Sequence, residues 1–240
     1  MSGWLRGALG LLYPSGLRCL ACRAEISEGE GLVGGLCPHC AEGMQVLPCG
    51  EPCPACGQPD GSRGCRACLP EPRRALQQIQ AAYSHDGAAR MLVHALKYRG
   101  LRQAGHLLAA GMAQVCADMQ GEWDVLAPVP LHRRRQRQRG YNQAEVLARE
   151  TGVVCGLPVA CLLLRSRATM EQARLTREAR SQNLQGAFAV RGQVRGLRIL
   201  LVDDVCTTGA TGEAAAIALR EAGAQAVSLL TATIAVYRGG

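Results

Sequence analysis

Aromatic side chains are scarce in this chain of 240 residues. Phe188 is the only phenylalanine, and it is accompanied by five Tyr and two Trp. Proteins that bind single-stranded nucleic acid without sequence preference usually stack the bases on rows of aromatic rings. The composition therefore argues against a binding surface built on stacking, and it predicts a core of Leu, Val, Ile and Ala.

Long hydrophobic runs are also missing. No stretch approaches the roughly 18–20 continuous apolar residues that a membrane helix needs. The first residues, MSGWLRGALGLLYP, contain a short apolar segment that ends at Pro14, and no small-residue cleavage site follows it. We therefore expect a cytoplasmic protein without membrane insertion.

Lysine is nearly absent, since Lys97 is the only Lys among 27 basic residues. The charge is also uneven along the chain. Seven Arg balance seven acidic residues in residues 1–75, so residues 76–240 account for the whole net charge of +8. Such an excess favours anionic partners, either phosphates or nucleic acid. A basic surface that merely keeps the protein soluble is the alternative.

Cysteine, in contrast, is abundant, and nine of the thirteen Cys lie between residues 19 and 68. Eight of these form four CxxC pairs, namely Cys19 with Cys22, Cys37 with Cys40, Cys53 with Cys56, and Cys65 with Cys68. A CxxC turn brings two thiolates to one ion at about 2.3 Å, and a second pair completes the tetrahedral site that Zn²⁺ favours. We predict a double zinc-ribbon domain over residues 1–75. The first two pairs would bind one structural zinc and the last two another, with a single zinc or an interleaved pairing left open.

Other interpretations of the cysteines are weaker. A disulfide-bonded secreted domain needs an export signal, which the sequence does not show, and cytosolic thiols stay reduced. A redox site needs one CxxC, whereas four are present. Cys49 is left over, either as a bystander or as a replacement ligand, and we expect His39 to point away from the metal.

The composition changes after Pro70 and Pro72, so we place a domain boundary near residue 75. Beyond it, patterns predict strands within 75–87, 124–130, 157–164, 187–190, 197–203 and 224–236, and helices at 88–100, 103–118, 142–151 and 211–222. Strands and helices alternate, and the strands are apolar throughout, which predicts a mainly parallel sheet with helices on both faces over residues 76–240. Ligands of such sheets bind beyond the carboxyl ends of the strands.

The stretch VDDVCTTGAT, residues 202–211, follows the strongest predicted strand. Its loop, made of Thr207, Thr208, Gly209, Ala210 and Thr211, leads into a helix, where backbone N–H groups favour an anion. The loop is neither a P-loop nor a GxGxxG motif. Asp203 and Asp204 suit a vicinal diol, because carboxylates accept strong hydrogen bonds from hydroxyls. A diol beside a phosphate describes a ribose 5-phosphate.

The stretch ILLVDDVCTTGAT resembles the signature of type I phosphoribosyltransferases, which bind phosphoribosyl pyrophosphate. The CxxC pairs, HALKYRG, APVPLHRRRQRQRGYNQ and RATMEQARLTREARSQNLQGAF then resemble, in order and over essentially the whole chain, the ComF family of bacterial competence proteins. That resemblance implies a zinc ribbon joined to a type I phosphoribosyltransferase fold, and a role in the uptake of transforming DNA. It places Asp203 and Asp204 on the ribose hydroxyls as catalytic residues and the loop 207–211 on the 5-phosphate. Cys49 is an addition to the pattern, and Cys206 occupies a variable position.

Two Arg-rich segments and Lys97 complete the predicted site. Residues 131–140, LHRRRQRQRG, form a predicted loop in which Arg133 and Arg134 bind the pyrophosphate, although a solvated run of charge is the alternative. Asn142 and Gln143 are candidate caps of the next helix. The long segment between Arg165 and Asn183 resembles the flexible hood of the family, and its candidate residues are Thr169, Gln172, Arg180 and Asn183. Lys97 is either a ligand-binding residue, as the resemblance favours, or a surface Lys.

Two functions are compatible with these features. One is a protein of DNA uptake that binds phosphoribosyl pyrophosphate and single-stranded DNA, with other DNA-uptake proteins as further partners. The other is an active, Mg²⁺-assisted phosphoribosyltransferase that acts on an unidentified small acceptor, such as a nucleobase, an amine or a salvage metabolite. We lean towards an enzyme, but the sequence identifies neither an acceptor nor its base.

Overall fold

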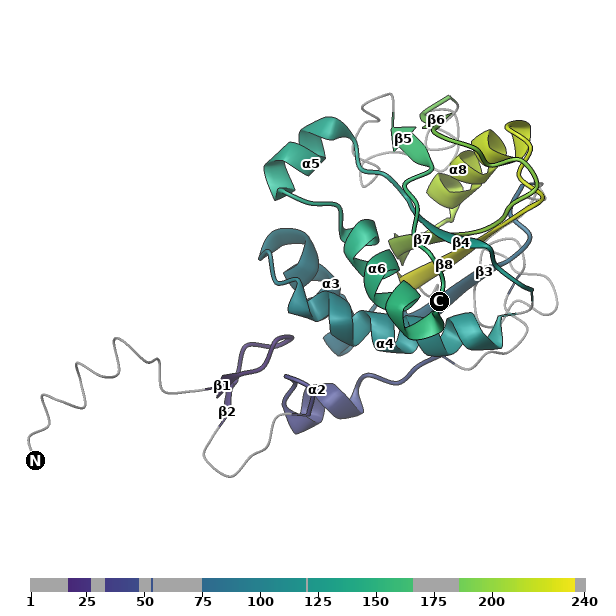
Figure 1. Ribbon diagram of the computed structural model, residues 1–240. Helices are drawn as coiled ribbons and strands as arrows, with labels where there is room; N and C mark the ends of the chain where they lie inside the picture. The colour runs from purple at the N-terminus through teal and green to yellow at the C-terminus, as the bar shows by residue number, and fades with distance from the viewer. Residues whose placement is uncertain are drawn as a thin grey trace, which may run out of the picture.

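The computed structural model describes residues 17–26, 33–47, 53, 75–119, 121–165 and 186–235. The N-terminal part contains two short antiparallel strands, β1 (Leu17–Arg18) and β2 (Glu25–Ile26), and the helix α2 (Pro38–Glu42). It lies beside the helices α3 (Gly87–Tyr98) and α4 (Gln103–Asp118) of the larger part (Figure 1).

A four-stranded parallel sheet forms the centre of the larger part. Its strands are β3 (Ile79–Ser84), β8 (Ala226–Ile234), β7 (Arg198–Cys206) and β4 (Val125–Pro128), in that spatial order. A parallel bridge between Leu126 and Val159 continues the sheet beyond β4. All nine residues of β8 are buried, as expected for a strand covered on both faces.

Alternate residues of the strands face two separate cores. On one face, Leu200 and Leu230 pack with α3, α4 and the helix α6 (Gln143–Cys155). On the other face, Leu201 and Leu229 pack with the helix α8 (Ala210–Glu221) and with a hairpin of β5 (Leu163–Arg165) and β6 (Phe188–Val190). Helices therefore cover both faces, and the predicted α/β architecture is confirmed.

Two predictions for individual elements were wrong. The Arg-rich segment predicted as a loop contains a short helix, α5 (Arg133–Arg139), because His132 caps its start with a hydrogen bond from the Arg134 N–H and Gly140 ends it with a φ of 77°. Residues 157–164 do not form one strand. They cross from the bridge at Val159 to β5, which pairs with β6 outside the main sheet.

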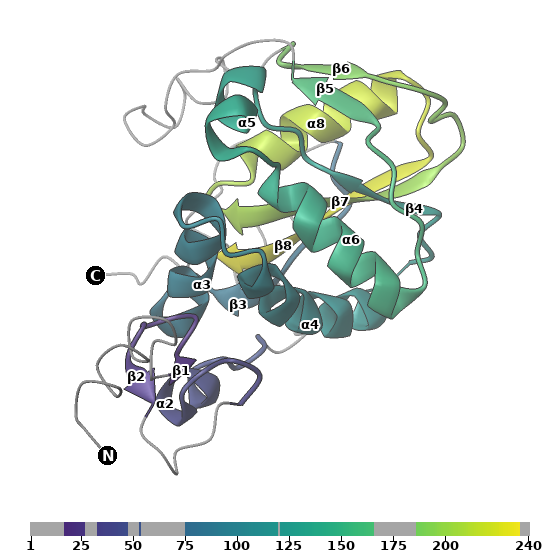
Figure 2. The same cartoon turned by 60° about the vertical axis from the view of Figure 1, so that its left-hand side comes forward.

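The carboxyl ends of the parallel strands meet at one edge of the sheet. In Figure 2, the heads of β7 and β8 point towards the side of the molecule where α3 and α5 lie. This edge positions the residues that follow β3, β4, β7 and β8. Within the described parts of the chain, no helix has the length and apolar character needed to cross a bilayer.

Candidate functional site

Four cysteines from the first two CxxC pairs converge into one cluster. The Sγ atoms of Cys19, Cys22, Cys37 and Cys40 all lie within 4.8 Å of one another. The Sγ atoms of Cys22 and Cys37 are 3.8 Å apart, and a tetrahedral zinc site with Zn–S bonds of about 2.3 Å has S···S edges of about 3.8 Å. The cluster therefore fits zinc in both ligand type and geometry.

Local backbone structure builds this cluster. Cys19 and Cys22 lie on a turn in which Arg23 takes a positive φ of 69° and its N–H donates to the Cys19 carbonyl. Cys37 is the N-cap residue of α2, and Cys40 lies inside that helix. The Leu20 N–H donates to the Gly35 carbonyl at 3.0 Å and so joins the two turns.

The thiols of the cluster differ in how readily they ionise. Burial opposes ionisation of Cys19, but backbone N–H groups outweigh it and lower its pKa to about 6. Burial and the neighbouring thiols raise the pKa of Cys40 far above its usual range. Metal binding requires thiolates, so a cation that binds here displaces protons.

The second predicted zinc site is not tested by the structure. Of its four cysteines only Cys53, which is buried, is described. Cys56, Cys65 and Cys68 lie outside the described residues, as does Cys49. His39 is exposed and does not belong to the four-cysteine cluster, in agreement with the prediction for it.

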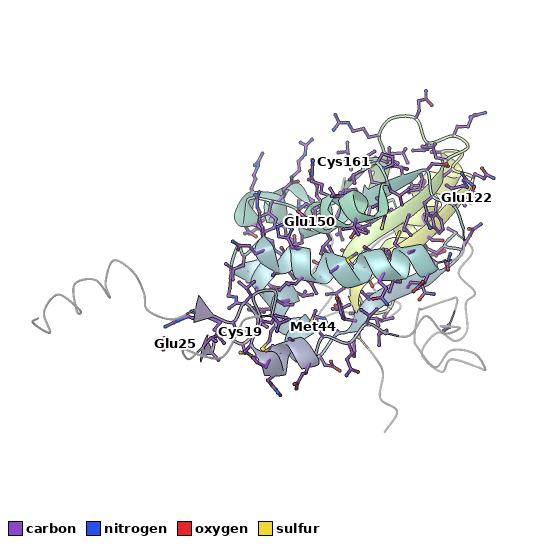
Figure 3. All side chains as sticks on the ribbon, turned by 60° about the horizontal axis from the view of Figure 1, so that its bottom comes forward. Cys19, Glu25, Met44, Glu122, Glu150 and Cys161 are labelled. Atoms are coloured by element: carbon purple, nitrogen blue, oxygen red, sulfur yellow. The ribbon has the colours of Figure 1, made fainter. Side chains whose placement is uncertain are left out.

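The cysteine cluster rests on α3 and α4 of the larger part. Cys19 and Cys40 belong to the same buried cluster as Leu92, Leu96 and Leu108. Directly after α3, the guanidinium of Arg99 donates to the Leu20 carbonyl at 2.6 Å. In Figure 3, Cys19 lies close to Met44 and far from Cys161.

At the carboxyl edge of the sheet, β7 brings Asp203 and Asp204 into different surroundings. Asp204 is only 7% exposed. Its Oδ1 is 2.6 Å from the Nζ of Lys97 in the last turn of α3, and its Oδ2 accepts a hydrogen bond of 3.0 Å from the Nε2 of Gln143 in the first turn of α6. Gln143 thus does not cap α6. Asn142 does, since its Oδ1 accepts from the Ala144 N–H.

Asp203 is half-buried, and its Oδ1 accepts a hydrogen bond of 2.8 Å from the Asp204 N–H. Burial and the Asp204 carboxylate raise the pKa of Asp203 to about 7, although Lys97 and Arg165 lie near enough to oppose this. A carboxyl group of this kind changes its charge near neutral pH.

Sequence reasoning missed two polar residues at the ends of neighbouring strands. Thr233 at the end of β8 donates to the Asp204 carbonyl at 3.2 Å. Its hydroxyl therefore accepts from the Nδ1 of His85, which follows β3, at 2.8 Å. Burial and the cations of Lys97 and Arg90 lower the pKa of His85, so the ring is neutral and its Nε2 carries a lone pair. Only the strand order 3-8-7 brings these residues together.

The loop after β7 leads directly into α8. Gly209 has a φ of 70° and is the N-cap residue, and the Oγ1 of Thr208 accepts from the Ala210 N–H at 3.4 Å. Thr207 is exposed and Thr211 begins the helix together with Ala210. The helix α8 therefore begins shortly after β7 ends, and the free N–H groups at the start of a helix favour an anion.

The predicted arginines are placed unequally. Arg133 and Arg134 are exposed on α5, and within the described ranges no contact joins them to the acid pair. Arg165 is nearer, because the charges of Asp203 and Arg135 both affect its pKa, which burial lowers. Its guanidinium lies 5.5 Å from the centre of the Phe188 ring. The predicted hood residues Thr169, Gln172, Arg180 and Asn183 lie outside the described residues.

Comparison with known proteins identifies the family. No protein-family model matches the chain. The chain is 31% identical over 215 residues to the DNA utilization protein YhgH of Salmonella typhi, covering 86% of this chain and 92% of that protein. The chain belongs to the ComF/YhgH family. It is also 28% identical over 225 residues to competence protein F of Haemophilus influenzae, covering 88% of this chain and 94% of that protein. With the competence protein ComFC of Bacillus subtilis it shares 25% identity over 238 residues, or 93% of this chain and 87% of that protein.

Solved structures similar to this ComF/YhgH chain include two enzymes. One is the glutamine phosphoribosylpyrophosphate amidotransferase of B. subtilis, with 25% identity and a TM-score of 0.39 over 55% of this chain and 26% of that one. The other is the orotate phosphoribosyltransferase of Mycobacterium tuberculosis, with 19% identity and a TM-score of 0.36 over 60% and 62%. In the larger part of the chain, the parallel sheet and its helices position the acid pair and the loop after β7.

Proposed function

We propose that this chain binds phosphoribosyl pyrophosphate at the carboxyl edge of its sheet and acts in the uptake or use of DNA. One observation carries the proposal: an oriented acid pair lies near the carboxyl end of β7, and a Thr/Gly loop with a left-handed Gly209 leads from that strand to the start of α8. Carboxylates suit the ribose hydroxyls, and the start of a helix suits the 5-phosphate. The names of its relatives, DNA utilization protein and competence protein, support the DNA role.

Each part of the site has a stated task in this proposal. Asp203 accepts hydrogen bonds from the ribose, the loop 207–211 binds the 5-phosphate, and Arg133, Arg134 and Arg165 provide cations for the pyrophosphate. Mg²⁺ would require few ligands from the chain and would supply positive charge that stabilises the pyrophosphate. Zinc in the cysteine cluster would be structural, because four thiolates leave no open position.

An active phosphoribosyltransferase is the second candidate function. In such a reaction the bond between the anomeric carbon and the pyrophosphate breaks, its electron pair leaves with the pyrophosphate, and an acceptor atom bonds to that carbon and loses its proton. Arg165, whose charge acts on Asp203, favours this reading, because cations stabilise the departing pyrophosphate. His85 has a neutral imidazole beside the acid pair, which is the kind of group that can take the acceptor's proton.

Calorimetric titration tests the binding proposal directly. Phosphoribosyl pyrophosphate should bind the parent chain more tightly with Mg²⁺ than without it, and the Asp203→Asn, Asp204→Asn double variant should lose most of that affinity, roughly 1.5–3 kcal/mol for each charged hydrogen bond lost. Equal affinity in the double variant would contradict the proposal. A screen for released pyrophosphate with nucleobases, amines and DNA as acceptors then separates an enzyme from a binding protein.

A further inference from the structure

The two acids of the pair differ in how many of their oxygens are engaged. Both oxygens of Asp204 have partners, since Oδ1 pairs with Lys97 and Oδ2 accepts from Gln143. Asp203 has one engaged oxygen, Oδ1, which accepts from the Asp204 N–H. Its Oδ2 has no hydrogen-bond partner among the residues that the structure describes. The adjacent carboxylates therefore present different surfaces to a ligand.

The partners of Asp204 are themselves fixed. Gln143 is 1% exposed, and the preceding Asn142 anchors the start of α6 through a hydrogen bond of 3.0 Å from its Nδ2 to the Val129 carbonyl. Lys97 approaches from α3, and its side chain is 20% exposed against 10% for Asp204. Thr233 binds the Asp204 carbonyl from β8. Three elements, α3, α6 and β8, thus restrain this residue, and its carboxylate cannot rotate without breaking an ion pair and a buried hydrogen bond.

We infer that Lys97 and Gln143 are positioning residues, which hold the Asp204 carboxylate in place so that Asp203 alone offers a free carboxylate oxygen to the ribose diol. This inference rests on the proposed binding of phosphoribosyl pyrophosphate, and it specifies which of the two acids contacts the ribose. It also assigns Lys97 a different role from the ligand contact that the sequence predicts. A buried carboxylate needs a nearby cation, because isolation in a medium of low dielectric would favour its protonated form.

The choice of lysine is consistent with this role. Arg supplies 26 of the 27 basic residues, and the one Lys stands where its Nζ meets a single buried oxygen. An ammonium group is a compact point charge that needs no second acceptor, whereas a guanidinium presents five donors in a rigid fork. Next to a carboxylate whose other oxygen already binds Gln143, a guanidinium would bury N–H groups without partners.

Separate titrations with ribose 5-phosphate and with inorganic pyrophosphate distinguish positioning from direct contact. Lys97→Met should weaken ribose 5-phosphate binding roughly tenfold, because it acts through Asp204. It should change pyrophosphate binding by no more than about twofold. Arg90→Met is the matched control, since it removes a cation from the same helix and should alter neither affinity beyond that limit. Loss of pyrophosphate binding with ribose 5-phosphate binding intact would overturn the inference.

A double-mutant cycle covers the case in which Lys97→Met folds poorly. Lys97→Met with Asp204→Asn removes both charges and should bind ribose 5-phosphate within about twofold of Asp204→Asn alone, because the two residues act as one unit. Asp203→Asn should instead add its own loss to that of Lys97→Met. Additive losses for Lys97 and Asp204 would overturn the inference.

Because the chain has one Lys, reductive ¹³C-methylation labels a single side chain and keeps its charge. The Lys97 signal should shift in Asp204→Asn and stay unchanged in the Arg90→Met control. A signal indifferent to Asp204→Asn overturns the inference without reference to any ligand. A parent chain that binds neither ribose 5-phosphate nor pyrophosphate overturns the proposed function instead, and the NMR signal still decides whether the pairing exists.

Discussion

The four-cysteine cluster and the acid pair are both polar constellations that contact the region of α3, but they are assembled differently. All four thiols come from two CxxC turns within residues 19–40. Asp204, in contrast, depends on α3, α6 and β8, whose contributing residues lie 29 to 107 positions away along the chain. A site of the first kind is built by local turns, whereas one of the second kind exists only when the sheet has folded.

The two regions also differ in what stabilises them. The part of the N-terminal region that the structure describes buries few large apolar side chains of its own, chiefly Ile26 and Leu36. The sheet buries Leu, Val and Ile on both faces. We therefore expect the N-terminal region to need a metal to fold, and the sheet to fold without one. Four experiments test this contrast.

Loss of zinc should produce the largest effect. Cys40→Ser removes one ligand of a site whose zinc binding is worth about 10 kcal/mol or more in small zinc domains. Metal analysis should then show one zinc fewer per chain, and hydrogen exchange should show residues 17–47 unprotected while β7 and β8 keep their protection. Cys161→Ser, an exposed thiol outside the cluster, is the control. Unchanged zinc content in Cys40→Ser would contradict the metal site. Simultaneous unfolding of the sheet would show that the two regions do not differ in what stabilises them.

Binding of single-stranded DNA should distinguish the regions by charge. If five phosphates are contacted, the affinity should fall with salt at a log–log slope of roughly −3 to −4, and changing Arg133, Arg134 and Arg135 to Ala should reduce that slope by about 2. Arg18→Ala and Arg23→Ala, both exposed on the N-terminal region, should leave it unchanged. Fluorescence anisotropy at several salt concentrations measures the affinity and its salt slope for the parent and for both sets of variants. A flat salt response, or equal effects of the two sets, would assign the basic charge another role.

A substitution in the loop after β7 should affect the ligand more than the fold. Gly209 has a φ of 70°, so Gly209→Val introduces a β-branched residue in a left-handed conformation at a cost of about 1–3 kcal/mol, and it crowds the 5-phosphate. We expect loss of phosphoribosyl pyrophosphate binding with zinc retained. Gly192→Val, at a φ of 84° and with open space around it, applies the same strain away from the site. Equal ligand affinity in the two variants would contradict the 5-phosphate assignment.

The cysteine cluster could be predicted more fully from the sequence than the surroundings of the acid pair. The CxxC spacing identified Cys19, Cys22, Cys37 and Cys40 correctly as one cluster, because all of its ligands are close in the chain. The sequence also placed Asp203 and Asp204 near the carboxyl end of a strand, which extends three residues beyond its predicted end to Cys206, and the loop 207–211 at the start of a helix.

The residues that contact the acid pair could not be predicted from sequence patterns. Gln143 was assigned to a helix cap, and His85 and Thr233 carried no pattern, since only the order of strands brings them together. The helix α5 was missed because seven charged and polar residues show no apolar periodicity, and its caps at His132 and Gly140 determine it.

The smallest effect that we predict concerns the pH dependence of stability. The folded chain holds the proton of Asp203 up to about pH 7, whereas the ordinary pKa of an unfolded Asp is 3.8. Between these values the unfolded chain binds fewer protons than the folded one, so the free energy of unfolding falls as the pH rises, and the loss is complete above pH 7. Asp203→Asn lacks this ionisation. It should therefore be more stable than the parent at pH 8 and equal to it near pH 4. Chemical denaturation of both proteins across this range measures the difference.

The cysteine cluster does not confound this comparison. Its thiolates take up protons and release their metal in acid, which destabilises the N-terminal region, but the parent and Asp203→Asn share that change and it cancels in their difference. Glu221→Gln, at an exposed position of α8, is the control and should show no pH-dependent difference from the parent. If Asp203→Asn is instead less stable than the parent at pH 8, then the Asp203 carboxylate is stabilised in the folded chain without any ligand. The acid pair would then be a structural site, as the cysteine cluster is proposed to be. It would not be a site whose folded state is destabilised in favour of ligand binding.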